Sequence, residues 1–330
     1  MANTLMATAF LGIDVAKDKL DVILHQEQQS TYRVFANTAD GFAALHTWLA
    51  PLGVARLHIC LEATGSYSDG VAYFLASHGY RLSLLNPAVL VNYRKAKQVR
   101  RKTDRQDAQL LALYAQENQP RLWQPLPQKL VQLRYLLAYR QHVLTMHGQV
   151  CNRLHAGRLT PWTAEQFLWQ SVHLQQALKQ ADQQIQRHVR AHADLWTIYQ
   201  RLQTIPGIGP ISAATLLACL GDISRFPRAG ALVSLAGLAL KVHESGTSVH
   251  ERPQIDRHGQ SSLRQLLYWC AISAMRSDPQ FAAFAHRLRQ RGKPTKVIIV
   301  AVMRKLLHIV YGVWKSQTDY DPNKVLGMPA

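Results

Sequence analysis

The chain has 330 residues, and its 38 Lys and Arg residues outnumber its 20 Asp and Glu residues to give a formal net charge of +18. Such a charge favours a polyanionic partner, although charge alone does not separate DNA, RNA and an anionic membrane. No run of eighteen apolar residues occurs, and no basic segment precedes an apolar stretch at the amino terminus, so we expect neither a membrane span nor a secretory signal. The four widely spaced cysteines are expected to be reduced core residues, which fits a cytoplasmic protein.

The first 120 residues alternate between predicted strands and helices. Apolar runs that end at turn residues predict strands at 10–15, 20–25, 31–36, 57–62 and 81–85. Helical spacing of apolar residues predicts helices at 39–50, 66–78 and 104–117. This alternation indicates an α/β domain with a mixed sheet over residues 1–120.

Four carboxylates in this region occupy positions that suit a metal site. Asp14 and Glu62 each lie at the end of an apolar run that reads as a strand. Asp104 and Asp107 are three residues apart at the start of a predicted helix, so their side chains face the same way. Clustered carboxylates repel one another until a hard cation such as Mg²⁺ or Mn²⁺ binds them. Taken alone, however, each acid is better explained as a turn or cap residue.

The surroundings of the two helix acids change this balance. Seven cations lie within twelve residues, at Arg94, Lys95, Lys97, Arg100, Arg101, Lys102 and Arg105. A solvated surface explains such a run poorly, whereas cations that hold phosphates beside acids that hold metal explain both charges. Two metal ions about 4 Å apart can hold the attacking and leaving oxygens of a phosphodiester. The pattern therefore predicts a nucleic-acid site with divalent metal.

The middle of the chain, 121–203, is predicted to be a helical linker. Prolines at 120, 125 and 127 punctuate its start, and the helical pattern breaks around 157–161. One apolar stripe in its second half runs through Leu174, Leu178, Ala181 and Ile185. This spacing favours packing against a partner helix or a short coiled coil.

The last region, 204–330, is predicted to be mostly helical. Its string Ile-Pro-Gly-Ile-Gly-Pro at 205–210 is typical of a helix–hairpin–helix element. Gly207 and Gly209 would allow close approach, and the next helix would offer free N–H groups to a phosphate. A tight interhelical turn with Pro210 in the first helical turn explains the string equally well.

Ordered motifs in both halves of the chain resemble a known family. In the first half they are Gly-Ile-Asp-Val-Ala-Lys (12–17), Asp-Val (21–22), Glu-Ala-Thr-Gly-Ser-Tyr (62–67), Asn-Pro-Ala (86–88) and Lys-Thr-Asp (102–104), with Asp-Ala at 107–108. In the second half they are Ile-Pro-Gly-Ile-Gly (205–209), Ala-Gly-Leu (236–238), Glu-Ser-Gly-Thr-Ser-Val (244–249), Leu-Arg (263–264) and Leu-Tyr (267–268). With these motifs the chain resembles the DEDD transposases of the bacterial IS110 insertion-sequence family, which includes the Piv-like DNA invertases.

This resemblance implies a RuvC-like, RNase H-type first domain and a recombinase that moves a mobile DNA element. It implies that Asp14, Glu62, Asp104 and Asp107 hold the metal and that Ser245 is the nucleophile, which forms a 5′-phosphoserine bond. By its residues alone, the segment 244–248 is an ordinary polar turn. The resemblance further implies a bridge RNA that pairs with donor and target DNA, and a dimer or tetramer with active sites shared between protomers. Such a protein acts on the nucleoid in the bacterial cytoplasm.

The stretch after the serine motif departs from the family pattern. Gln254 stands where a basic residue is usual, and Asp256 adds an acid, whereas Arg257 and Gly259 keep the usual cation and glycine. Arg257 and Arg264 are still predicted to contact nucleic acid. The effect of the two departures on phosphate contacts stays open.

Two other classes of protein also stay open. In a structure-selective nuclease of the RuvC type, the same acids would activate water and Ser245 would only form a turn. In a non-catalytic DNA- or RNA-binding protein, the acids would be structural. A trapped protein–DNA adduct separates a recombinase from the first class, and metal-dependent strand cleavage dismisses the second. A sugar-kinase-like role for the Gly-Ile-Asp string at 12–14 lacks a second Gly-rich phosphate loop.

Overall fold

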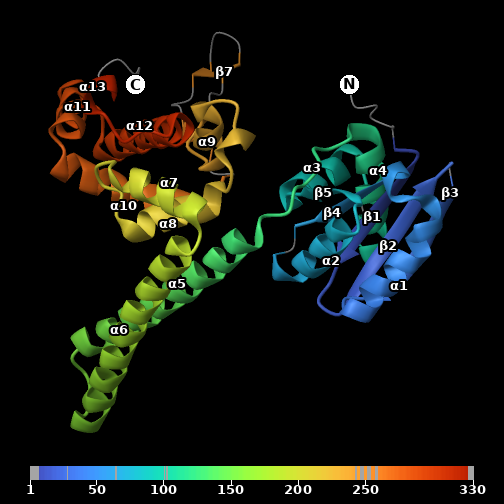
Figure 1. Ribbon diagram of the computed structural model, residues 1–330, viewed down its shortest axis with the longest axis horizontal. Coiled ribbons are helices and arrows are strands. Elements are labelled where there is room, and N and C mark those ends of the chain that lie inside the picture. The colour runs from blue at the N-terminus through green and yellow to red at the C-terminus, as the bar shows by residue number, and fades with distance from the viewer. Residues whose placement is uncertain are drawn as a thin grey trace. The chain divides into compact units, whose positions relative to one another are not determined.

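The computed structural model describes residues 7–27, 29–63, 65–99, 101, 103–241, 244–245, 249–250, 254–256 and 259–325. The chain divides into two compact units, Met1–Pro125 and Leu126–Ala330 (Figure 1). Each unit buries a hydrophobic core of its own. The division predicted from the sequence, into 1–120, 121–203 and 204–330, stays a prediction.

The first unit is built on a five-stranded sheet with the order β3-β2-β1-β4-β5. Its strands are β1 Ala9–Val15, β2 Lys19–Gln26, β3 Gln29–Ala36, β4 Leu57–Glu62 and β5 Arg81–Leu85. The first three strands pair in an antiparallel way, whereas β4 runs parallel to β1 and β5 runs parallel to β4. All five predicted strands and the mixed sheet are confirmed.

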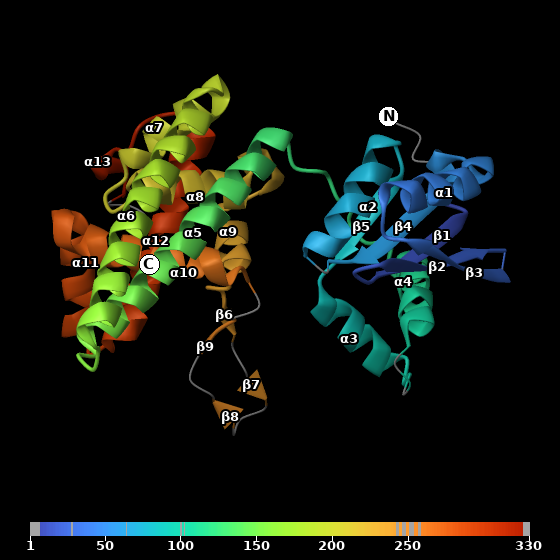
Figure 2. The ribbon, with the colours of Figure 1, turned by 90° about the horizontal axis from the view of Figure 1, so that it is seen from below.

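Helices cover both faces of this sheet, as Figure 2 shows. They are α1 Ala39–Leu49, α2 Ser66–Ser77, α3 Pro87–Ala96 and α4 Asp104–Asn118, with short 3-10 turns at Ala50–Leu52 and Val54–Arg56. On one face, Leu11 of β1 and Leu75 of α2 are buried in a common core. On the other face, Cys60 of β4 is buried against Leu111 of α4. The predicted α/β domain is confirmed.

Helix α3 is the element of this unit that the sequence did not predict. Leu90 is its buried residue, and its other residues, apolar ones such as Val91 included, are exposed or half-exposed, so no apolar face is marked in the sequence. Its start does carry a local signal, because the Asn86 side chain accepts a hydrogen bond from the Ala88 backbone N–H at 2.9 Å and Pro87 occupies the first helical position.

The second unit is mostly helical, as predicted. Its helices are α5 Gln128–His155, α6 Pro161–Arg190, α7 Ala193–Gln203, α8 Pro210–Leu220, α9 Ala229–Leu235, α10 Ser261–Ser277, α11 Pro279–Gln290, α12 Thr295–Ser316 and α13 Pro322–Val325, with a 3-10 turn at Ile223–Arg225. Two short strand pairs join β6 Leu240–Lys241 to β9 Gln254–Ile255 and β7 Glu244–Ser245 to β8 Val249–His250. The sequence did not predict these strands, which have only two residues each.

Helices α5 and α6 pack side by side along much of their length (Figures 1 and 2). The break predicted near 157–161 is confirmed, because the turn between the two helices lies there. Along the predicted stripe of α6, Ala181 and Ile185 are buried. At one end of this pair, Leu133 and Val189 join the core of the second unit.

Helix α12 is long and apolar enough to cross a membrane by length and composition alone. Its apolar face instead lies in the core of the second unit, where Val302, Leu306 and Val310 are fully buried. Burial of this kind is typical of the central helix of a helical domain.

Candidate metal and nucleic-acid site

Asp14 and Glu62 lie at the carboxyl ends of neighbouring parallel strands. Ile13 of β1 is paired with Leu61 of β4, so each acid stands one residue beyond this pair. Side chains alternate between the faces of a sheet, which places both acids on the face that α4 covers. Both are half-buried. Two of the four predicted ligands therefore share one face and one edge of the sheet.

Helix α4 approaches this face unusually closely because Gly12 has no side chain. A Cβ added to Gly12 would fall 1.9 Å from the carbonyl oxygen of Ala108 and 2.5 Å from the backbone nitrogen of Ala112. Such a contact is backbone against backbone, so no side-chain rotation could relieve it. Gly12, two residues before Asp14 in β1, thus determines how near α4 can lie to β1.

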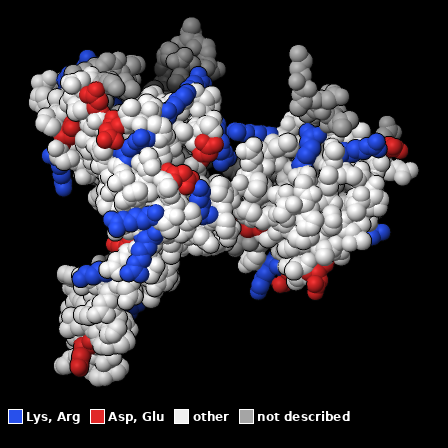
Figure 3. Space-filling model, viewed as in Figure 1, with Lys and Arg blue, Asp and Glu red and all other residues white. Residues whose placement is uncertain are grey.

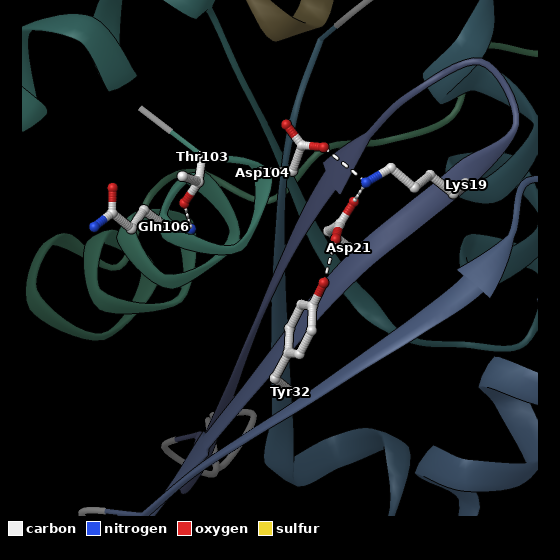
Figure 4. Close-up of polar contacts among 6 residues, drawn as sticks. All are labelled: Lys19, Asp21, Tyr32, Thr103, Asp104 and Gln106. Atoms are coloured by element: carbon white, nitrogen blue, oxygen red, sulfur yellow. Dashed lines mark hydrogen bonds and ion pairs between the residues drawn. The ribbon is translucent and has the colours of Figure 1, made fainter. Parts of the chain in front are cut away.

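The first turn of α4 carries the other two acids. Thr103 caps the helix, and its hydroxyl accepts a hydrogen bond from the backbone N–H of Gln106 at 3.2 Å (Figure 4). Asp104 and Asp107 follow directly, where negative charge interacts favourably with the helix dipole. Asp107 faces the sheet and is only 5% exposed, whereas Asp104 is exposed.

Asp107 is paired with a cation from α3. The Arg94 guanidinium contacts its Oδ1, and both side chains are largely removed from solvent, with exposures of 17% for Arg94 and 7% for Asp107. Nε of Arg94 is buried and has no hydrogen-bond partner among the residues that the structure describes. The cation that was predicted to bind phosphate therefore lies against a predicted metal ligand.

Asp104 is held by Lys19, at the start of β2. Nζ of Lys19 lies 2.7 Å from Oδ2 of Asp104 and 2.9 Å from Oδ2 of Asp21, the second contact being an ion pair without hydrogen-bond geometry (Figure 4). The hydroxyl of Tyr32 donates a hydrogen bond of 2.5 Å to the other oxygen of Asp21. The two carboxylates, Asp104 first, raise the pKa of Lys19 above its ordinary value.

Asp21 is a fifth acid of this site that the sequence did not single out as a ligand. It is the direct cross-strand partner of Asp14 and is only 1% exposed. Residues opposite each other in an antiparallel pair point to the same face. The sequence signal was an acid inside the apolar run of β2; Lys19 lies two residues before it on the same strand, whereas the register of β2 and β3 brings Tyr32 to it.

The donor chemistry of these acids fits a divalent cation, because hard cations prefer carboxylate oxygens. Within the part of the chain that the structure describes, no group of three His, Cys, Asp or Glu side chains is arranged to hold one ion. The two helix acids contact Lys19 and Arg94 instead. Metal binding would therefore require these side chains to turn from their cations toward a common ion.

Of the remaining cations of the basic run, some contact neighbouring side chains and others are exposed to solvent. Lys97 forms an ion pair with Glu117 at 2.7 Å, and the guanidinium of Arg105 lies 4.9 Å from the ring centre of Tyr32. Lys95 and Arg101 are exposed, while Arg100 and Lys102 lie outside the described residues. On the face that Figure 3 shows, Lys and Arg side chains are spread over both units.

In the second unit, the predicted hairpin string forms the turn between α7 and α8. Gly207 has φ of +82°, and a Cβ on it would fall 2.3 Å from the carbonyl oxygen of Cys270 in α10. This glycine is therefore required by its conformation and by packing, as the interhelical-turn interpretation expects. Gly209 is exposed and has open space around it. Phosphate contacts at these glycines stay a prediction.

The structure describes the other predicted site residues of the second unit only in part. Ser245 belongs to β7, whose backbone pairs with β8, and its side chain lies outside the described part of the chain. Arg257 lies outside it as well. Arg264 donates a hydrogen bond from Nη1 to the carbonyl oxygen of Ala236 at 3.1 Å, so one of its nitrogens supports the fold.

Comparison with protein families gives two matches. The model of a DEDD transposase family of the IS110 type matches residues 11–157, and the model described as "Transposase IS116/IS110/IS902 family" matches residues 199–286. The first match spans all four predicted metal ligands, and the second spans the serine motif.

Similar proteins extend these matches to nearly the whole chain. The pilin gene-inverting protein of Moraxella bovis is 35% identical over 321 residues, which are 96% of this chain and 98% of that protein. An uncharacterized protein of insertion element IS110 from Streptomyces coelicolor is 32% identical over 127 residues, 38% of this chain and 31% of that protein. Among solved structures, RuvC of T. thermophilus in complex with a Holliday junction substrate matches 35% of this chain and 99% of that chain, with 15% identity and a TM-score of 0.26.

Proposed function

The chain belongs to the IS116/IS110/IS902 family of DEDD transposases, and we propose that it is a recombinase that cuts and rejoins DNA of a mobile element. The observation that carries this proposal is the seating of α4 on Gly12, because it brings the first turn of α4 to the sheet edge of Asp14 and Glu62. Full-length similarity to a pilin gene-inverting protein extends the proposal to inversion of a DNA segment.

We assign Asp14, Glu62, Asp104 and Asp107 as ligands of Mg²⁺ or Mn²⁺. A bound ion would stabilise negative charge on the phosphodiester and lower the pKa of the attacking hydroxyl. Asp14 and Glu62 lie in strands β1 and β4, and Asp104 and Asp107 lie in the capped first turn of α4, so a regular element carries each acid. Acids on regular elements keep their geometry better than acids on loops.

Ser245 is the proposed nucleophile. Its hydroxyl gives up a proton as Oγ bonds to phosphorus, and the bond from phosphorus to the 3′ oxygen breaks, so that the leaving strand ends in a hydroxyl. Attack by that hydroxyl, or by one from another strand, reverses the step and rejoins DNA. This assignment rests on the family resemblance of the motif at 244–249.

The family resemblance also supports partners for which the structure itself provides no contact. We propose a structured bridge RNA that pairs with donor and target DNA, and a dimer or tetramer in which one protomer supplies the acids and another supplies Ser245. The formal charge of +18 supports binding to such polyanions. The protein would act on the nucleoid in the bacterial cytoplasm.

Replacement of single acids tests the metal assignment. Asp14→Asn and Asp107→Asn should abolish Mg²⁺-dependent cleavage of DNA that carries the element ends, because each removes one anionic ligand. DNA affinity of Asp14→Asn, measured by fluorescence anisotropy without divalent metal, should change little, because no cation is lost. Asp40→Asn is the matched control, since Asp40 is also a first-turn acid, but in α1 and exposed. A ligand variant that cleaves at the wild-type rate would overturn its assignment.

A further inference from the structure

We propose that Lys19 and Arg94 are internal counter-ions of the acid site, which a divalent ion must displace and which then become available to nucleic-acid phosphate. The inference rests on the proposed metal function. Each acid of the first turn of α4 is paired with a cation from a different element, Asp104 with Lys19 of β2 and Asp107 with Arg94 of α3.

In each helix acid, one carboxylate oxygen is engaged by a cation. Lys19 contacts Oδ2 of Asp104, and Arg94 contacts Oδ1 of Asp107. A divalent ion bound between these carboxylates would lie close to both cations, and like charges at short range repel. Metal binding therefore competes with these two ion pairs, and the apparent metal affinity is lowered by the free energy of weakening them.

The two pairs differ in what holds them together. The Arg94–Asp107 pair is largely buried, and Nε of Arg94 lacks a hydrogen-bond partner among the described residues. A buried ion pair with an unsatisfied donor recovers little of its desolvation cost, although removal of one partner leaves a costly lone charge. The Lys19–Asp104 pair is 45% and 55% exposed, so it contributes little free energy and exchanges easily.

Lys19 stays near the site after Asp104 leaves it. Its second partner, Asp21, is 1% exposed and also accepts a hydrogen bond from Tyr32, so Asp21 is fixed in the sheet. Displaced Lys19 would therefore remain beside the acid site, and a phosphate bound at this site would be its next anionic partner. Arg94 lies next to exposed Lys95, in the run of cations that is predicted to contact phosphate.

This exchange couples metal and nucleic acid. If metal releases two cations to phosphate, metal must strengthen DNA binding and DNA must strengthen metal binding by the same factor. The metal-free protein, in turn, keeps its helix acids neutralised.

Mn²⁺ binding to the full chain, measured by electron paramagnetic resonance without DNA, tests the inference independently of activity. Lys19→Met should tighten Mn²⁺ binding about two- to fivefold, because an exposed competitor is lost. Arg94→Met should tighten it by more than Lys19→Met, because a nearly buried acid loses its partner. Lys17→Met is the charge-matched control, since Lys17 is also exposed and, within the described residues, no ion pair joins it to the acids of the site.

Melting temperatures provide the second measurement. Without metal, Arg94→Met should melt below the wild type, and saturating Mn²⁺ should raise its melting temperature by more than it raises that of the wild type. Unchanged or weaker Mn²⁺ affinity in both variants, with Asp107-dependent binding in the wild type, would overturn the counter-ion inference and leave the metal assignment standing. Absence of Asp107-dependent Mn²⁺ binding in the wild type would overturn both.

Discussion

Gly12 of β1 lies directly beneath Ala108 of α4, and a Cβ on the glycine would fall 1.9 Å from the Ala108 carbonyl oxygen. The contact joins the strand that carries Asp14 to the helix that carries Asp104 and Asp107. The packing of α4 on the sheet and the proposed metal site therefore depend on the same contact between Gly12 and Ala108.

Gly12→Ala should damage both stability and cleavage. The added methyl group would meet backbone atoms, so α4 must move away from the sheet, and overpacking of this kind costs about 1–3 kcal/mol or more. Urea unfolding and Mg²⁺-dependent cleavage measure the two effects. Gly148→Ala in α5 is the control, because no described neighbour lies within 4 Å of the place that its Cβ would take and helix propensity favours Ala by up to about 1 kcal/mol. Normal cleavage by Gly12→Ala would show that close helix seating is unnecessary.

Lys95 and Arg101 should contribute to DNA affinity without reading sequence. Replacing both with Gln should weaken binding to unrelated duplexes alike, and should reduce the slope of log K against log salt by about 0.9 for each lost phosphate contact. Binding titrations across a range of salt concentrations measure this slope. Arg56→Gln provides the control, since Arg56 is an exposed cation of the same unit outside the run. A double variant with the wild-type slope would mean that neither side chain touches phosphate.

His58 should make the first unit sensitive to mild acid. Burial, and then the charge of Arg81, lower the pKa of His58 to about 4. Its Nε2 lies 2.8 Å from Oγ of Ser83, whose hydroxyl donates to backbone carbonyls, so the neutral imidazole donates this bond. In the unfolded chain, His has a pKa near 6.5. The unfolded state therefore binds more protons between these values, and stability should fall as pH drops from about 6.5 to about 4.

Urea unfolding of the wild type and of His58→Gln at pH 7.5 and pH 5.0 isolates this contribution. The wild type should lose more stability than the variant between the two pH values, by at most about 1.4 kcal/mol per pH unit. Other titrating groups are common to both proteins and cancel in the comparison. Equal losses would mean that His58 does not stay neutral in the folded chain.

The sequence predicted those features that depend on local pattern. All five strands of the sheet follow from runs that end at turn residues, and α4 follows from the helical spacing of its apolar residues. Helix α3 was missed because it buries Leu90 and otherwise stays largely exposed, so its periodicity is weak.

The partners of the acids could not be predicted, because they depend on tertiary contacts. The basic run suggested that Arg94 binds phosphate, but chain proximity does not reveal that α3 directs it at Asp107. Lys19 meets Asp104 across a separation of 85 residues, and Tyr32 meets Asp21 through the register of β2 and β3. Local charge patterns therefore located the site, whereas the ion pairs within it required the fold.

The most direct test of the central claim is a search for a covalent bond between Ser245 and DNA. A nicked substrate that carries the element junction should trap the wild-type protein in an adduct that survives denaturant, and peptide mapping should place the phosphate on Ser245. Ser245→Ala should lose the adduct and recombination while folding normally, and Thr247→Ala should keep both. If Ser245→Ala still forms the adduct or still cuts and rejoins DNA, the serine mechanism is wrong, and cleavage without any adduct would favour a nuclease that uses water.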